Sequence, residues 1–404
     1  MASQRHHFLM RVLIPLVIVL VVAWLVPLEM PVGMDISQAI LSARSVLNGG
    51  DIYGLGVSQV ATDAQNHALS GSLPYPGPPW SFPPLIILGL LSPERAAALW
   101  FILSVVCLAG SIAVVTVSLS PALRASIVIA ALISAPVQGH LIVGQMTIIA
   151  LLGVAVLLAG HRRASWVVMG IGLSLLSFRP HLGLPVVVVA GLYLLVHEPR
   201  RFLLAATWAT AIVLCLGVLA VVVDPTCLRA YPELMVALNS LPSNKVCDTC
   251  SSLPVLLTDR SPTASDSVWT ERFILAGVSV PALGYPLLRW GKSLAVVVSG
   301  AVCVSLLSAP YNRNYDFVLL LVPLIIIGRR AWALGACRIG RARIALGLIA
   351  TGAVIGGVLP YFVSRTVQGD ILWLSALLGY VGALLVAQGP PEPKIAVLSD
   401  DYTA

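Results

Sequence analysis

Hydrophobic residues in this chain fall into long continuous runs, separated by short polar connections. A bilayer-spanning helix needs about 20 mostly apolar residues, whereas a membrane β-strand alternates apolar and polar positions over about ten. The runs have helical length and do not alternate, which predicts an all-α, polytopic membrane bundle of about twelve helices. The predicted spans are residues 8–28, 96–119, 123–138, 142–160, 164–178, 182–197, 202–223, 271–288, 293–309, 316–328, 343–362 and 371–388.

Composition supports this class and excludes others. Of 404 residues, 58% are hydrophobic and 10% are charged, and the mean hydropathy is +0.95. A soluble domain carries about 25% charged residues, and a disordered chain has low hydrophobicity. We therefore expect one transmembrane domain over residues 1–388 and a disordered cytoplasmic tail over 389–404.

The net charge of +7 is informative mainly through its location. Basic residues gather in connections at 161–163, 198–201, 289–292 and 329–343. Because every second connection between successive spans lies on the same side of the membrane, these four share one side. The positive-inside rule makes that side cytoplasmic, together with both termini. Two larger loops, 29–94 and 224–271, are then extracytoplasmic, and the lipid bilayer rather than nucleic acid is the expected environment.

The first outer loop contains an amphipathic pattern from Asp35 to Leu47, followed by Asn48-Gly49-Gly50. It predicts a helix lying on the outer leaflet. Asp35 has two interpretations. It is an N-cap, completed by Gln38 as a capping box, or it is a general base at the membrane surface. The two roles are compatible.

Arg179 and His181 lie at the outer end of a predicted span. Positive charge is disfavoured on that side. The Arg179 side chain either snorkels to water or holds an anion such as a phosphate through paired hydrogen bonds. His181 is either a second donor or a turn residue.

Further polar residues occupy two other outer turns. Arg313, Tyr315 and Asp316 precede a very apolar span, where an Arg313–Asp316 salt bridge is one interpretation and a wall contacting sugar hydroxyls is the other. His140 and Gln145 form a weaker polar notch of the same kind.

The remaining motifs suggest structural roles. Cys247 and Cys250, in the second outer loop, are candidates for a local disulfide. The aromatic and proline-rich stretch 73–84 predicts an interfacial anchor before a short re-entrant segment at 85–91. No metal-ligand spacing is apparent, and we expect neither a metal nor a cofactor.

In their order along the chain, several of these motifs resemble glycosyltransferase family 87, the GT-C enzymes that use polyprenyl-phosphate sugars. The family includes mycobacterial mannosyl- and arabinofuranosyltransferases of the cell envelope. The motifs are Asp35, Gly49–Tyr53, Phe82–Pro84, Gly144–Gln145, Arg179–His181 and Tyr315–Asp316. The resemblance implies a GT-C fold in a bacterial plasma membrane, with Asp35 as catalytic base. Many relatives have Lys where this chain has Arg179, and some have His within the turn 312–314.

An outward site also requires a particular donor, because nucleotide sugars are not available outside the cytoplasmic membrane. A polyprenyl-phosphate sugar meets that requirement, and a glycolipid or glycan of the cell envelope is the expected acceptor. The expected reaction inverts the anomeric centre, with Asp35 removing the acceptor proton and Arg179 or Arg313 stabilising the departing phosphate. The competing hypothesis is a secondary transporter or a flippase for lipid-linked saccharides.

Overall fold

The computed structural model describes residues 34–54, 75–240, 252–258, 268–310, 312–336, 340–363 and 365–388. Every regular element within these ranges is helical, and seven helices are long and apolar enough to cross a membrane. The prediction of an all-helical, multi-pass membrane protein is thereby confirmed. The first predicted span, the Cys247–Cys250 pair and the C-terminal tail lie outside the described residues.

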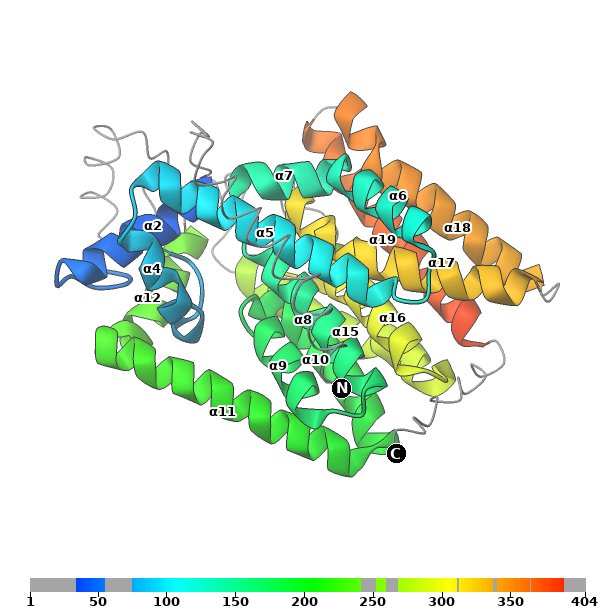
Figure 1. The fold of residues 1–404 in the computed structure, drawn as a ribbon, viewed down its shortest axis with the longest axis horizontal. Coiled ribbons are helices and arrows are strands. Elements are labelled where there is room, and N and C mark those ends of the chain that lie inside the picture. The colour runs from blue at the N-terminus through cyan, green and yellow to red at the C-terminus, as the bar shows by residue number, and fades with distance from the viewer. Residues whose placement is uncertain are drawn as a thin grey trace, which may run out of the picture.

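Figure 1 shows the described helices in their order along the chain. They are α2 (Met34–Leu47), η1 (Pro79–Ser81), η2 (Pro83–Leu85), α4 (Ile86–Gly89), α5 (Pro93–Val115), α6 (Pro121–Leu132), α7 (Ala135–Val143), α8 (Thr147–Arg162), α9 (Trp166–Leu176), α10 (Pro180–His197), α11 (Pro199–Val223), α12 (Cys227–Ser240), α14 (Leu253–Leu257), α15 (Val268–Trp290), α16 (Leu294–Ser308), η3 (Asn314–Leu320), α17 (Leu321–Ala336), α18 (Gly340–Gly357), η4 (Leu359–Phe362) and α19 (Arg365–Ala387).

The structure does not confirm twelve spans, because several apolar runs form shorter or broken helices. Helices α8, α9 and α16 have 16, 11 and 15 residues. At 1.5 Å per residue, α9 is roughly 17 Å long, which is less than the roughly 30 Å hydrocarbon core. The run predicted at 123–138 becomes α6 and α7, which meet at a bend of 61°. Pro136 lies just after this break, where its ring prevents one continuous helix.

The core consists of two main clusters. The larger one is built by α8, α10, α16, α17 and α19, and α16 is buried along nearly its whole length. The smaller one joins α2 to α4 and to the start of α5, at the end of the molecule where α12 also lies (Figure 1). In it Ile36, Ala39, Ile40 and Ala43 are buried. The apolar face of α2 is therefore covered by protein, which differs from the prediction of a helix resting on the lipid surface.

Basic side chains tie several helix ends together. Arg162 at the end of α8 donates to Val114 O of α5 at 2.6 Å, and Arg329 of α17 donates to Ser118 Oγ at 2.7 Å. His161 contacts Glu198, between α10 and α11, at 2.8 Å. We call this the basic end. Helices α9 and α16 run away from it, and α10 runs back toward it, so the α9–α10 and α16–η3 connections lie at the opposite end of the bundle.

Candidate functional site

Asp316 joins three segments of chain at that opposite end. Its Oδ1 accepts a hydrogen bond from Thr147 Oγ1 at 2.6 Å and lies 3.4 Å from Arg179 Nη2. Its Oδ2 accepts from the backbone N–H of Arg313 at 3.0 Å. The Asp316 side chain is 1% exposed and that of Arg179 is 13% exposed. A buried carboxylate is tolerated when its oxygens receive charged and polar donors in this way.

Arg179 is held in place by a tight connection between α9 and α10. A second hydrogen bond runs from its Nη2 to Gln145 Oε1 at 2.6 Å. Four residues later, a Cβ on Gly183 would lie 1.9 Å from Leu176 O, so only glycine allows this close approach of the two helices. The Arg179 side chain turns inward to Gln145 and Asp316, and the snorkelling interpretation was wrong. His181, in the first turn of α10, lies in the electric field of Arg179 and Asp316.

Asp35 belongs to the same cluster of charges. Burial raises the pKa of its carboxyl above the usual 3.8, while Arg179 and Arg313 act in the opposite direction. Asp316 raises the pKa further, and a side-chain hydrogen bond with Tyr315 lowers it. Asp35 Oδ2 is buried without a hydrogen-bond partner among the described residues. The first turn of α2 thus presents a carboxylate oxygen that can still accept a proton.

The predicted N-cap role of Asp35 is not what the structure shows. Helix α2 already begins at Met34, so Asp35 lies within its first turn. A capping box would require the Gln38 side chain to accept a backbone N–H. Gln38 Oε1 is instead buried without a hydrogen-bond partner in the described part of the chain. Asp35 therefore contributes its negative charge at the helix N-terminus, and the capping box is absent.

His140 brings a further polar side chain to this region. It is fully buried on α7, and neither ring nitrogen has a hydrogen-bond partner within the described ranges. Asp316 and Arg179 are the charges that act on it. The preceding residue, Gly139, lies next to Tyr315: a Cβ at Gly139 would be 3.9 Å from the Cβ of Tyr315. Helix α7 therefore packs directly against η3.

We name this group the Asp35–Asp316 cluster. It contains eight residues that the sequence suggested and one, Thr147, that it did not: Asp35, His140, Gln145, Thr147, Arg179, His181, Arg313, Tyr315 and Asp316. The ion pair of Asp316 runs to Arg179, whereas the interpretation from sequence paired it with Arg313. Thr147 had no signal beyond being a polar residue at the start of an apolar run. Within the described residues, no group of three or more metal-ligating side chains was found.

Gly144 allows the end of α7 to lie close to the first turn of α2. It ends α7 with φ 76° and ψ 41°, and a Cβ there would lie 2.7 Å from Ile36 Cβ, next to Asp35. Gly144→Ala is expected to destabilise the protein by about 2 kcal/mol or more, because it adds left-handed strain to an overpacked contact. Thermal unfolding of the purified protein measures this change.

Gly139→Ala is the matched control for that prediction. It lies on the same helix, and its Cβ would be an ordinary 3.9 Å from the nearest atom, Tyr315 Cβ. Alanine is favoured over glycine inside a helix, so this variant should be no less stable than the wild type. Equal unfolding temperatures for Gly144→Ala and Gly139→Ala would contradict the packing argument.

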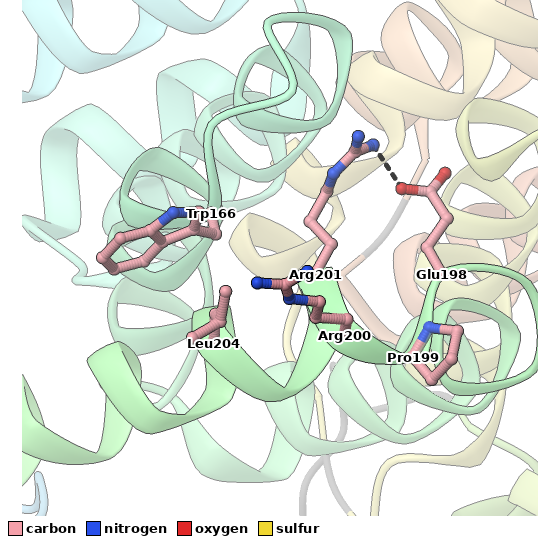
Figure 2. A pocket seen from close by; sticks show the side chains of 6 residues that line it. All are labelled: Trp166, Glu198, Pro199, Arg200, Arg201 and Leu204. Carbon is pink, nitrogen blue, oxygen red and sulfur yellow. Dashed lines mark hydrogen bonds and ion pairs between the residues drawn. The ribbon is translucent and has the colours of Figure 1, made fainter.

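A separate surface cavity lies at the basic end. Its volume is about 560 Å³, and it opens between the first turn of α9 and the start of α11 (Figure 2). None of its lining residues belongs to the Asp35–Asp316 cluster. The two features are separated by the length of α10, which is roughly 27 Å for 18 residues.

No family model, curated protein or solved structure matches this chain. The resemblance to glycosyltransferase family 87 therefore rests on the sequence motifs alone.

Proposed function

We propose that this protein is a membrane glycosyltransferase of the GT-C type. It would transfer a sugar from a polyprenyl-phosphate donor to a glycolipid or glycan acceptor of the cell envelope, with inversion at the anomeric carbon. The observation that carries this proposal is the convergence of Asp35 and Arg179 on one buried cluster, although 144 positions separate them in sequence (179 minus 35). An acid and a cation in one place are what the transfer chemistry requires.

Asp35 is the proposed general base. The acceptor oxygen bonds to the anomeric carbon, its proton passes to Asp35 Oδ2, and the bond between the anomeric carbon and the phosphate oxygen breaks. The electron pair leaves with the lipid phosphate. Burial raises the pKa of Asp35, and a carboxylate with a raised pKa is a stronger base. Its partnerless Oδ2 is the atom that would receive the proton.

The charges of the cluster suit the departing phosphate. Arg179 and Arg313 carry two formal positive charges, and Asp35 and Asp316 carry two negative ones. When Asp35 takes the acceptor proton, the four side chains change from neutral to a net charge of +1. At the same moment the phosphate gains one negative charge. Fixed cations then stabilise the transition state more than the ground state. Gln145 and Asp316 keep Arg179 oriented for that role.

The position of the cluster supports a lipid-linked donor. It lies at the end of the helices opposite the basic end, which the positive-inside rule assigns to the cytoplasm. In the proposed topology the site is extracytoplasmic in a bacterial plasma membrane. A donor there is held by its own polyprenyl chain, and we propose no cofactor or metal.

Donor choice is the direct test. Membranes containing the protein are incubated with labelled polyprenyl-phosphate mannose or arabinose, and the glycolipid products are extracted. We expect label transfer above that of membranes lacking the protein. Labelled nucleotide sugars should give no product once the lipid donor pool has been exhausted. Product formed from a nucleotide sugar under that condition would overturn the donor assignment.

A second candidate function is a transporter or flippase of lipid-linked saccharides. The 61° break between α6 and α7 favours it, because discontinuous helices line the substrate sites of many transporters. His140, buried in the last turn of α7, adds a polar group on one of the two helices that meet at that break. The same incubation separates the two functions. A flippase moves the labelled donor between leaflets intact, whereas a transferase produces a new glycosidic bond.

A further inference from the structure

The cavity at the basic end lies apart from the Asp35–Asp316 cluster. It is an open hollow of about 560 Å³ lined by six side chains: Trp166, Glu198, Pro199, Arg200, Arg201 and Leu204. They come from the first turn of α9, the α10–α11 connection and the first two turns of α11 (Figure 2).

The charge available in this cavity is positive. Its carboxylate, Glu198, is already engaged by Arg201 and by His161, the latter at 2.8 Å. Arg200 is exposed and forms no ion pair within the described part of the chain. Figure 2 shows the Arg201 guanidinium turned to Glu198 and the Arg200 guanidinium turned toward Leu204 and Trp166. One guanidinium is therefore left for an anion.

Apolar surface continues from the cavity along α11. Leu203, Leu204 and Trp208 are exposed, and only 11% of the most apolar window of α11 is buried. Trp166 meets Trp208 edge to face, with ring centroids 6.0 Å apart. Tryptophan is enriched at the level of lipid headgroups, and a span this exposed faces acyl chains. A ligand bound here would have a phosphate at one end and hydrocarbon at the other.

We propose that this cavity binds the headgroup of an anionic phospholipid. Arg200 contacts the lipid phosphate, Trp166 and Leu204 contact the glycerol and the first acyl carbons, and the chains lie along α11. Basic pockets between membrane helices on the cytoplasmic side bind anionic lipids in this manner. A soluble phosphate would use the arginine but leave the adjoining apolar face without a partner.

The test measures lipid binding to the purified full-length protein by native mass spectrometry. Phosphatidylglycerol is titrated with phosphatidylcholine as the neutral reference. Arg200→Gln is expected to weaken phosphatidylglycerol binding about five-fold, the effect of losing one cation near a membrane surface. Arg200→Lys keeps the charge and should retain most of the binding. Because Arg200 is exposed, each variant should elute and unfold like the wild type.

Arg343→Gln is the matched control. Arg343 is an exposed arginine near the start of α18. Figure 1 shows α18 on the opposite flank of the bundle from α11. The Arg343→Gln variant should bind phosphatidylglycerol like the wild type. Equal weakening in both glutamine variants would show a diffuse charge effect and overturn the proposal, as would no weakening in either. Arg200-dependent binding of glycerol 3-phosphate, without selectivity for phosphatidylglycerol, would assign the cavity to a soluble phosphate instead.

Discussion

Asp35→Asn is expected to lower the rate of sugar transfer by at least about 100-fold, the usual minimum contribution of a general base. Asparagine keeps the size of the side chain but cannot take the acceptor proton. The measurement compares product formed from labelled polyprenyl-phosphate sugar in membranes with equal amounts of each protein. The activity of the wild type should rise with pH through the raised pKa of Asp35, because the base must be deprotonated.

Glu94→Gln is the control for this experiment. Glu94 is an exposed carboxylate at the end of the same predicted outer loop and belongs to none of the motifs that carry the resemblance, so its replacement should leave transfer unchanged. Equal product from wild type and Asp35→Asn would remove Asp35 from the catalytic role.

Asp35→Asn should be less active than the wild type, but its stability relative to the wild type should increase as pH rises. Burial raises the folded-state pKa, so folding favours the protonated carboxyl. That contribution is fully present below the unfolded pKa near 3.8 and is lost as pH rises through the folded pKa. The unfolding temperature of Asp35→Asn minus that of the wild type should therefore increase as pH increases. A difference that is constant with pH would contradict the raised pKa.

Asp316→Asn is expected to lower the free energy of unfolding by about 3–5 kcal/mol. The substitution leaves the Arg179 guanidinium, 13% exposed, without its carboxylate partner. It also weakens the bond from Thr147, which connects α8 to η3, and the bond from the Arg313 backbone, which caps η3. Unfolding of the purified protein under one fixed detergent condition measures the loss.

The exposed pair Arg229–Glu233 provides the comparison. Its atoms are 3.1 Å apart, but its side chains are 89% and 65% exposed, so Glu233→Gln should have no measurable effect. Asp316→Asn combined with Arg179→Gln should lose less than the sum of the single variants, because the charges are removed together. A loss in Asp316→Asn no larger than in Glu233→Gln would show that the buried pair does not hold these helices.

The sequence was sufficient to place the polar residues of the cluster at one end of the bundle. Asp35, Arg179 and Asp316 each flank an apolar run, and alternating helix direction brings such ends together. It was not sufficient to predict their partners. Proximity in sequence suggested Arg313 for Asp316, whereas packing brought Arg179 to it from 137 positions away. The contact of Thr147 with Asp316 could not be predicted either, because tertiary contacts between distant segments leave no local sequence pattern.

Several predicted spans form helices too short or too bent to count as full spans in the described residues, for a different physical reason. Hydropathy reports how apolar a segment is, and a short helix buried in protein is as apolar as one surrounded by lipid. Helix α16 shows this, because its residues are buried among other helices and it has only 15 residues. The break before Pro136 could have been predicted from the sequence, because a proline interrupts a continuous helix.

The distance along the chain between Arg179 and Asp316 has a consequence for biosynthesis. A ribosome adding about 5–20 residues per second needs roughly 7–27 s to make the 137 residues between them. During that interval the arginine enters the membrane before its carboxylate exists, and Gln145, already synthesised, is the acceptor at hand. The proposed catalytic cluster is complete only when the nascent chain has grown beyond η3, so under this proposal an incomplete polypeptide released earlier would be inert.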